Sequence, residues 1–242
     1  MVFADVGSPK ICILADKESE KVLRWAQFLQ CPVNPSSPSD FFFHLHFEED
    51  RMLVRDLEKR VLEIDFDKNH LDYERRGHQG KNELIAKALG YAKGCRKVLD
   101  LSVGLAIDSV FLMQLGFQVT GVERSPMLYA LLSEAFSRTQ KDYLKSYQLH
   151  FADALTFLKE QKGLLDIDAI YFDPMYPHKK KSALPKQEMV VFRDLVGHDE
   201  DAASVLREAL TWPVRRVVVK RPLKAEELSP RVTHSFEGKV VR

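Results

Sequence analysis

The fold is decided by the stretch RKVLDLSVGLAIDSVFLMQLG, Arg96 to Gly116. An apolar strand pattern ends on Asp100, a turn follows at Gly104, and an apolar helix pattern runs to Gly116. A strand, an acid, a glycine turn and a helix start form the first βα unit of a nucleotide-binding sheet. The G-x-G pattern is broken, because Ala106 stands at the next glycine position. A turn that needs one glycine for its backbone conformation is therefore the alternative.

The same alternation of strand and helix patterns continues along the chain from about residue 82. Strands are predicted at 96–102, 117–123, 147–151, 167–173 and 215–222, with helices at 82–94, 107–116, 126–140, 153–163, 186–197 and 199–210. This alternation predicts an α/β fold with a doubly wound, mostly parallel sheet. In such sheets the ligand lies beyond the carboxyl ends of the strands. We expect the last strand to lie beside the strand at 167–173.

The first third of the chain has a different, β-rich pattern. A strand at 10–16 and a helix at 19–30 precede a predicted antiparallel meander over 41–66. We therefore divide the chain into a small N-terminal β-rich domain, 1–75, and a main domain, 76–242. His44 and His46 share one strand face, where a metal pair is an alternative to a solvated surface, but no third ligand is in view.

Composition limits the class of protein. The 242 residues carry a net charge of +1, so an anionic partner must be held by a local patch of cations. Cys12, Cys31 and Cys95 have neither disulfide nor zinc spacing, which favours free thiols in a reducing compartment. The N-terminus lacks a secretion-signal pattern, and no apolar run is long enough to cross a bilayer. We expect a cytoplasmic protein without a metal.

Acidic residues stand at the ends of the predicted strands, namely Asp100, Glu123, Asp153 and Asp173. Glu123 follows the glycine turn by about 20 residues, where an acid accepts hydrogen bonds from a ribose diol. An exposed strand-end carboxylate is the alternative there. Asp153 is placed to accept from an adenine amino group, and Asp108 either belongs to this group or caps its helix. Without a P-loop, several acids suit a cationic nucleoside such as S-adenosylmethionine better than NAD or a triphosphate.

The segment AIYFDPMYPHKKKSALPK, Ala169 to Lys186, ends a buried strand on Asp173. Two prolines stiffen the following loop, which presents one carboxylate, backbone carbonyls and the ring of Tyr176. Acceptors and a stacking ring are what an exocyclic amino group on a base requires. A common Asp-Pro turn is the alternative. The pattern therefore favours catalytic roles for Asp173 and Tyr176.

Cations follow this loop and the last strand. A run of like charges is usually solvated surface, but beside a base-handling loop it favours contacts with nucleic-acid phosphates. The predicted phosphate contacts are His178, Lys179, Lys180, Lys181, Lys220 and Arg221. Arg215, Arg216 and Lys224 belong to the same basic segment, and Arg75, Arg76 and Lys81 are expected to extend it.

The strings FDPMYPHKKKSAL, VVVKRP, VERSP and ERRGHQGKNELIAKALG together resemble the bacterial small-subunit rRNA guanine-N2 methyltransferase J family. The resemblance covers about residues 75–222. It implies a Rossmann-like class I S-adenosylmethionine-dependent methyltransferase that acts on one guanine N2 amine of 16S rRNA in the small ribosomal subunit. Its implied cofactor contacts, with the strand and turn residues above, are Asp100, Gly104, Ile107, Asp108, Glu123, Arg124, Asp153, Ala154 and Asp173.

The chain departs from this family at two cofactor positions. Ala106-Ile107-Asp108 stands where the family has Gly-Arg-Asp, so a contact at Ile107 must come from backbone or packing. Relatives can carry serines at the Asp153-Ala154 position. The last residues, GKVVR, resemble the beginning of the family's last strand, which leads us to expect a clipped C-terminus.

The expected reaction places the guanine amine on Asp173 and nearby carbonyls, in line with the methyl group of the cofactor. Alternatives are an amino-methyltransferase acting on DNA or a small molecule, and a catalytically inactive RNA-binding or assembly protein on the same fold. The lysines argue against a small molecule as the methylated substrate. A dehydrogenase would need a pyrophosphate-binding glycine loop, which nothing in this sequence resembles. The oligomeric state, and naked rRNA versus an assembled subunit as substrate, stay open.

Overall fold

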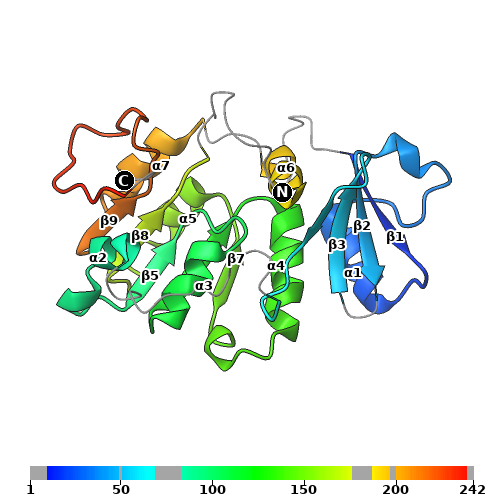
Figure 1. Ribbon diagram of the computed structural model, residues 1–242, viewed down its shortest axis with the longest axis horizontal. Coiled ribbons are helices and arrows are strands. Elements are labelled where there is room, and N and C mark those ends of the chain that lie inside the picture. The colour runs from blue at the N-terminus through cyan, green and yellow to red at the C-terminus, as the bar shows by residue number, and fades with distance from the viewer. Residues whose placement is uncertain (1–9, 49–50, 69–82, 176–186, 197–199, 239–242) are drawn as a thin grey trace.

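The chain forms two β-sheets that lie side by side with a helix between them (Figure 1). The computed structural model describes residues 10–48, 51–68, 83–175, 187–196 and 200–238. The predicted domain boundary near residue 75 falls outside these ranges.

The larger sheet has five parallel strands in the order β7-β6-β5-β8-β9. Its strands are β5 (Lys97–Asp100), β6 (Gln118–Glu123), β7 (Gln148–Phe151), β8 (Ala169–Phe172) and β9 (Arg216–Val219). Its helices are α2 (Leu84–Leu89), α3 (Ile107–Gln114), α4 (Pro126–Arg138), α5 (Ala154–Gln161), α6 (Gln187–Val196) and α7 (Ala202–Ala209). The predicted parallel α/β sheet is confirmed, as is the position of the last strand beside β8.

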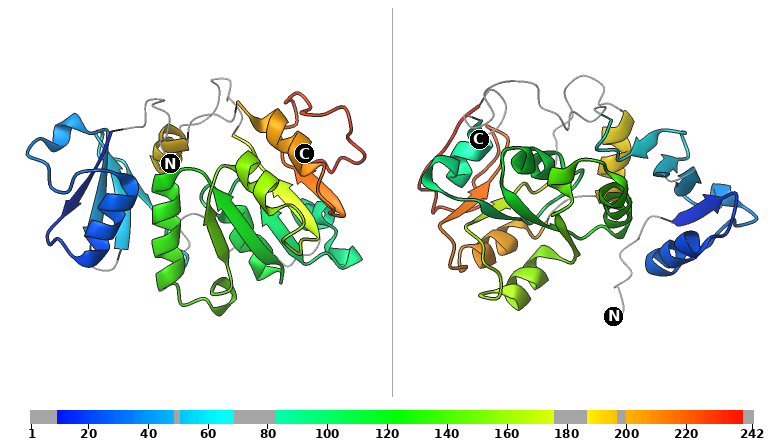
Figure 2. Two further views of the ribbon diagram at one scale, coloured as in Figure 1. Left: turned by 180° about the vertical axis from the view of Figure 1, so that it is seen from behind. Right: turned by 90° about the horizontal axis from the view of Figure 1, so that it is seen from below.

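Side chains of the central strands alternate between two apolar layers, as the two-residue period of a strand requires. Val98 of β5 belongs to one buried cluster and its neighbour Leu99 to the other. Tyr171 and Phe172 of β8 divide in the same way. Buried residues of α3 and α4 complete one layer, and buried residues of α5 and α7 complete the other. Both faces of the sheet are therefore covered, which leaves its carboxyl edge for a ligand (Figure 2).

The helix predicted at 82–94 is shorter in the structure, where α2 covers only Leu84–Leu89. Helix α2 ends at Leu89 because Gly90 takes a left-handed conformation, φ +82°, and a short 3-10 helix, Tyr91–Lys93, follows. A Cβ at position 90 would lie 2.8 Å from Nε of Arg216, so Gly90 also makes room for that side chain.

The smaller sheet has four strands, β1 (Ile11–Ala15), β2 (Phe43–Glu48), β3 (Arg51–Asp56) and β4 (Val61–Glu63). Strands β2, β3 and β4 form the predicted antiparallel meander, and β1 joins β2 in parallel through helix α1 (Glu20–Leu29). Ser19 caps α1, its side chain accepting from the backbone of Val22. His44 and His46 share a face, with ring centroids 6.3 Å apart, but no cluster of three metal-ligating residues occurs in the described ranges.

Helix α4 stands between the two sheets and joins them into one body (Figure 1). Its buried Glu134 accepts 2.6 Å from Nε1 of Trp25 on α1 and also pairs with Lys21 and Arg24. The aromatic rings of Trp25 and Tyr129 pack edge to face with centroids 6.4 Å apart. One apolar cluster consequently runs from the smaller sheet through α4 into the larger one.

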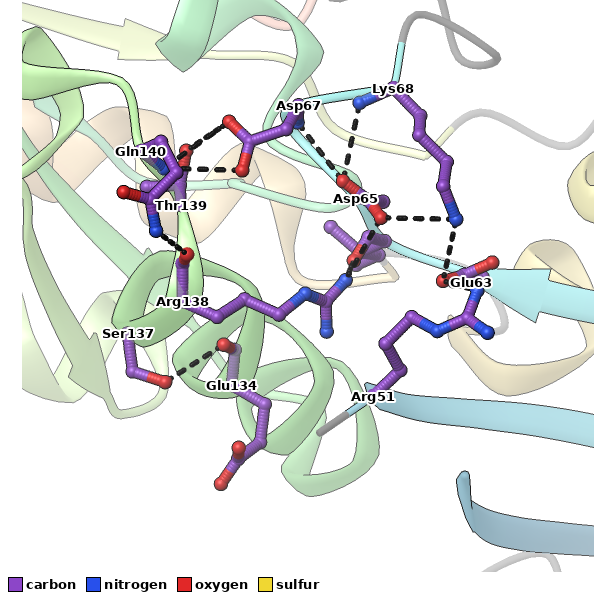
Figure 3. A network of polar contacts seen from close by, with 11 residues as sticks. Arg51, Glu63, Asp65, Asp67, Lys68, Glu134, Ser137, Arg138, Thr139 and Gln140 are labelled. Atoms are coloured by element: carbon purple, nitrogen blue, oxygen red, sulfur yellow. Dashed lines mark hydrogen bonds and ion pairs between the residues drawn. The ribbon is translucent and has the colours of Figure 1, made fainter. Parts of the chain in front are cut away.

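A second polar network ties the segment after β4 to the end of α4 (Figure 3). Arg138 donates to the carbonyl of Ile64 and lies 3.7 Å from a carboxylate oxygen of Asp65. Asp67 accepts 2.8 Å from the hydroxyl of Thr139, just past the helix. Polar contacts in the C-terminal half of α4, from Glu134 to Arg138, therefore fix the smaller sheet against the larger one. No helix in the described ranges is long and apolar enough to span a membrane.

Candidate active site

A pocket of about 270 Å³ opens at the carboxyl edge of the larger sheet. Five parallel strands end there, and the acids predicted at their ends enter the same pocket. The charged residues that line it include Asp100, Asp108, Glu123, Asp153, Asp173 and Lys220. Glu123 and Asp173 thus share one crevice, as the sequence predicts.

Asp100 ends β5 as a buried carboxylate inside a hydrogen-bond network. It accepts 2.6 Å from the hydroxyl of Ser109 on α3 and 3.0 Å from the backbone N–H of Ser102. The hydroxyl of Tyr147 donates 3.3 Å to the hydroxyl of Ser109. It lies against Gly121 of β6, where a Cβ would come within 2.0 Å of the Tyr147 oxygen, so the position requires glycine. Burial raises the pKa of Asp100 to about 7, against the opposing effect of its hydrogen bonds.

Glu123 ends β6 and holds the first turn in place. Its two carboxylate oxygens accept 2.9 Å from the backbone N–H of Gly104 and 2.7 Å from that of Ser125. The side chain is buried, and burial raises its pKa to about 7. The alternative of an exposed strand-end carboxylate is therefore wrong.

The turn after β5 requires two left-handed residues. Gly104 has φ +55°, and a Cβ there would lie 3.2 Å from Cζ of Phe192 on α6. Ala106 has φ +59° and ψ +18°, a conformation that alanine rarely adopts. The broken G-x-G pattern thus keeps the backbone shape that glycine usually provides, with Ala106 carrying the strain.

The rim of the pocket is formed by the turns after β6 and β7. Asp153 is exposed and caps α5, its side chain accepting 2.9 Å from the backbone of Thr156. Ala154 is buried beneath it. Arg124 pairs with Asp201 at 3.3 Å, and Ile107 packs partly buried against the core. These residues all line the pocket. The cofactor contacts expected of Ile107, Arg124, Asp153 and Ala154 stay a prediction.

A charged cluster lies at the end of the pocket beside β8 and β9. The ammonium of Lys220 lies 2.6 Å from Asp108 and 2.8 Å from Asp173. The hydroxyl of Tyr171 donates 2.7 Å to Asp108. The backbone N–H of Asp173 donates 2.7 Å to the hydroxyl of Ser102, which fixes the start of the loop after β8.

This cluster corrects one interpretation of the sequence. Asp108 does not cap α3, because the N-cap is Ala106 and no side chain makes a capping bond there. Its carboxylate is turned instead to Tyr171 and Lys220. Burial raises the pKa of Tyr171 well above its ordinary value, so its hydroxyl stays protonated and donates.

The described residues of the predicted basic segment do not lie together on one surface. Arg215 and Arg216 lie at the amino end of β9, away from the pocket, near Asp168 and the carbonyl of Ala88 respectively. Arg221 is buried and donates 2.8 Å to the carbonyl of Glu226. Lys220 is in the pocket. Tyr176, His178, Lys179, Lys180, Lys181, Arg75, Arg76 and Lys81 lie outside the described residues.

The sequence does not single out Tyr171, Ser102 or the pocket position of Lys220. A partial signal for Lys220 exists, since it follows a strand expected beside β8 and so ends level with Asp173. Nothing in the sequence reveals its pairing with Asp108, which is 112 positions away.

The donor set of the pocket fits S-adenosylmethionine. Its acids face inward, which suits a ligand with a sulfonium and an ammonium group. Apolar walls are provided by Met189, Phe192 and Val205, which suit the adenine ring. Glu123 lies at the second strand end, the usual position for an acid that binds ribose hydroxyls.

Comparisons with known proteins agree with this arrangement. A family model described as SAM-dependent methyltransferase matches residues 29–242. Ribosomal RNA small subunit methyltransferase J of Bdellovibrio bacteriovorus is 71% identical over 98% of this chain and 94% of its own length. The protein of the same name from Dechloromonas aromatica is 40% identical over 75% of this chain and 76% of its own. A crystal structure of a SAM-dependent methyltransferase from Neisseria gonorrhoeae matches with a TM-score of 0.71 and 29% identity, over 96% of this chain and 93% of that one.

Proposed function

This chain belongs to the SAM-dependent methyltransferase family that includes ribosomal RNA small subunit methyltransferase J, and we propose that it methylates the N2 amine of one guanine in 16S rRNA. The names of the relatives support ribosomal RNA of the small subunit as the substrate. Such a reaction takes place in the cytoplasm. The single observation that carries the proposal is the convergence of strand-end acids in one pocket, with Asp173 beside Lys220 at one end.

S-adenosylmethionine supplies an electrophilic methyl group when it is bound. Glu123 is the proposed acceptor for the ribose hydroxyls, and Asp153 for the adenine amino group. Asp100 and Glu123 keep the Gly104 turn in shape through their hydrogen bonds to backbone N–H groups. These contacts exist before any ligand arrives, so the pocket is preorganised for the cofactor.

Asp173 is the proposed acceptor for the guanine amine. An aromatic amine is neutral at pH 7, so no strong base is needed before it attacks the methyl group. The carboxylate orients the amine in line and stabilises the positive charge that develops on nitrogen. The proton is then lost to solvent or to Asp173. Tyr176 is proposed to stack on the base, and the lysines at 179–181 to contact phosphates.

The proposal is tested by incubating the protein with radiolabelled S-adenosylmethionine and small ribosomal subunits from cells lacking the enzyme. Naked 16S rRNA from the same cells forms a parallel sample, and the modified nucleotide is mapped in both. We expect one guanine to carry the label on N2. Label on adenine or cytosine would contradict the guanine assignment, and no transfer to either sample would favour an inactive RNA-binding protein on this fold.

A further inference from the structure

The carboxylate of Asp173 and the ammonium of Lys220 form an adjacent acceptor and donor at the end of the pocket. They lie 2.8 Å apart, each directly after one of the neighbouring strands β8 and β9, and the backbone N–H of Lys220 donates 2.9 Å to the carbonyl of Phe172. Both side chains line the pocket, and each remains about one third exposed. A ligand that enters the pocket at this end therefore meets both groups together.

Lys220 is poorly suited to hold a phosphate. Its charge is already opposed by two carboxylates, those of Asp108 and Asp173, so the three side chains together carry a net negative charge. Burial alone would lower the pKa of Lys220, but the two carboxylates outweigh this and hold its pKa above the ordinary value. The lysine stays protonated, and the cluster as a whole repels an anion.

The ammonium has one donor to spare among the described residues. A lysine carries three N–H donors, and two of these are directed to Asp108 and Asp173. The third is available to an acceptor inside the pocket. Meanwhile Asp173, when ionised, accepts only, and its two oxygens can receive two parallel N–H donors.

This order of groups matches one base. Along its Watson–Crick edge guanine presents two donors, the N2 amine and N1–H, followed by the acceptor O6. Adenine and cytosine place an acceptor beside their amino group, which would face the carboxylate unfavourably, and uracil has only one donor. Base edges of unpaired RNA are commonly read in this way.

We propose that Lys220 is a specificity-determining residue that donates to O6 of the target guanine while Asp173 accepts from N1–H and N2–H. The inference rests on the proposed function, since it assumes guanine in this pocket. Asp108 and Tyr171 then act as positioning residues, because their hydrogen bonds hold the ammonium beside Asp173.

The test replaces one atom of the substrate. Small-subunit RNA is prepared with either guanine or 6-thioguanine at the mapped site, so that sulfur, a weak acceptor, replaces O6 while both donors remain. For the wild-type protein we expect kcat/KM to fall about tenfold, the usual cost of weakening a hydrogen bond to a charged donor. For Lys220→Met we expect a lower kcat/KM on guanine but less than about a twofold difference between the two RNAs.

Lys224→Met is the matched control, because it removes an exposed lysine four positions along the chain. It should keep the tenfold preference of the wild type. Lys220→Arg retains donors and should keep part of it. Equal wild-type rates on the two RNAs would overturn the inference without any variant. The inference would also be overturned if Lys220→Met kept the full preference for guanine over 6-thioguanine. The same holds if Lys220→Met lost kcat/KM equally on both RNAs and the salt dependence of RNA binding fell by about one phosphate contact. Absence of wild-type transfer to guanine would instead overturn the proposed function, and this inference with it.

Discussion

At the scale of single residues, the site depends on carboxylates whose neighbours differ. Asp173 lies beside a lysine and keeps about one third of its side chain exposed, whereas Asp100 and Glu123 are buried among backbone donors. The first arrangement suits an acceptor for the substrate amine. The second suits carboxylates that hold a turn, and Glu123 has lone pairs left to accept from the cofactor's ribose hydroxyls as well. Variants of Asp173 and Glu123 separate these roles.

Asp173→Asn should lower kcat by about 10²- to 10³-fold, because an amide accepts through only one atom and stabilises developing charge less well. The melting temperature should change little, since the backbone bond to Ser102 remains. Methyl transfer from labelled S-adenosylmethionine measures the first effect and thermal unfolding the second. Asp142→Asn, which alters an exposed carboxylate, is the control. Near wild-type activity of Asp173→Asn would refute the role of Asp173.

Ala106→Gly should leave stability nearly unchanged although it removes a buried methyl group. Relief of roughly 1–2 kcal/mol of left-handed strain offsets about 0.8 kcal/mol lost with the methyl and about 0.4–1 kcal/mol lost to the greater freedom of glycine in the unfolded chain. Urea denaturation provides the comparison. Ala130→Gly, the same change at a buried position inside α4, has no such strain to relieve and should lose about 1–2 kcal/mol. Equal losses in both variants would show that the turn is unstrained.

Glu123→Gln should change the pH dependence of stability in the ligand-free protein. The folded-state pKa of Glu123 is raised to about 7 from 4.5, so the protonated form favours folding. Its contribution is fully present below pH 4.5 and is lost as the pH rises through 7. The melting temperature of the variant should therefore improve relative to wild type across this window and level off above it. Glu160→Gln, an exposed change on α5, should follow the wild type. A difference that does not vary with pH would contradict the assignment.

At the scale of elements, the positions of helices and strands follow from apolar periodicity, and the exceptions have local causes. The strands β5, β6 and β8 are correctly predicted because each is an apolar run closed by an acid, Asp100 and Glu123 as last residues and Asp173 directly after Phe172. Helix α2 ends early because Gly90 leaves helical geometry. The parallel pairing of β1 with β2 is not visible in the sequence, since an apolar strand pattern carries no direction.

Helix α4 is the element on which the relation between the two sheets depends. Glu134→Ala should lower the free energy of unfolding by about 2 kcal/mol, because it leaves the buried indole N–H of Trp25 without its acceptor. Denaturant unfolding gives the value. Glu160→Ala removes an exposed glutamate from α5 and should change stability by less than about 0.5 kcal/mol. If both variants lost the same amount, Glu134 would not hold α1 against α4.

At the scale of the whole molecule, the class of fold and the edge that binds ligand are predictable, but the grouping of side chains is only partly so. The meeting of Glu123 and Asp173 in one pocket follows from the parallel sheet. The pairing of Lys220 with Asp108 does not, because it joins the end of β9 to the start of α3 across the finished fold. The sequence therefore predicts that Lys220 contacts RNA phosphates, whereas the structure leads us to place Lys220 against the target base.

We propose that one crevice between Glu123 and Asp173 holds the cofactor with its reactive end toward Asp173 and Lys220. A crystal structure with S-adenosylhomocysteine, the demethylated product, would show where the cofactor lies. We predict ribose hydroxyls within hydrogen-bonding distance of Glu123 and the sulfur directed to the Asp173–Lys220 end. A ligand bound elsewhere, or one whose sulfur points away from Asp173, would contradict it.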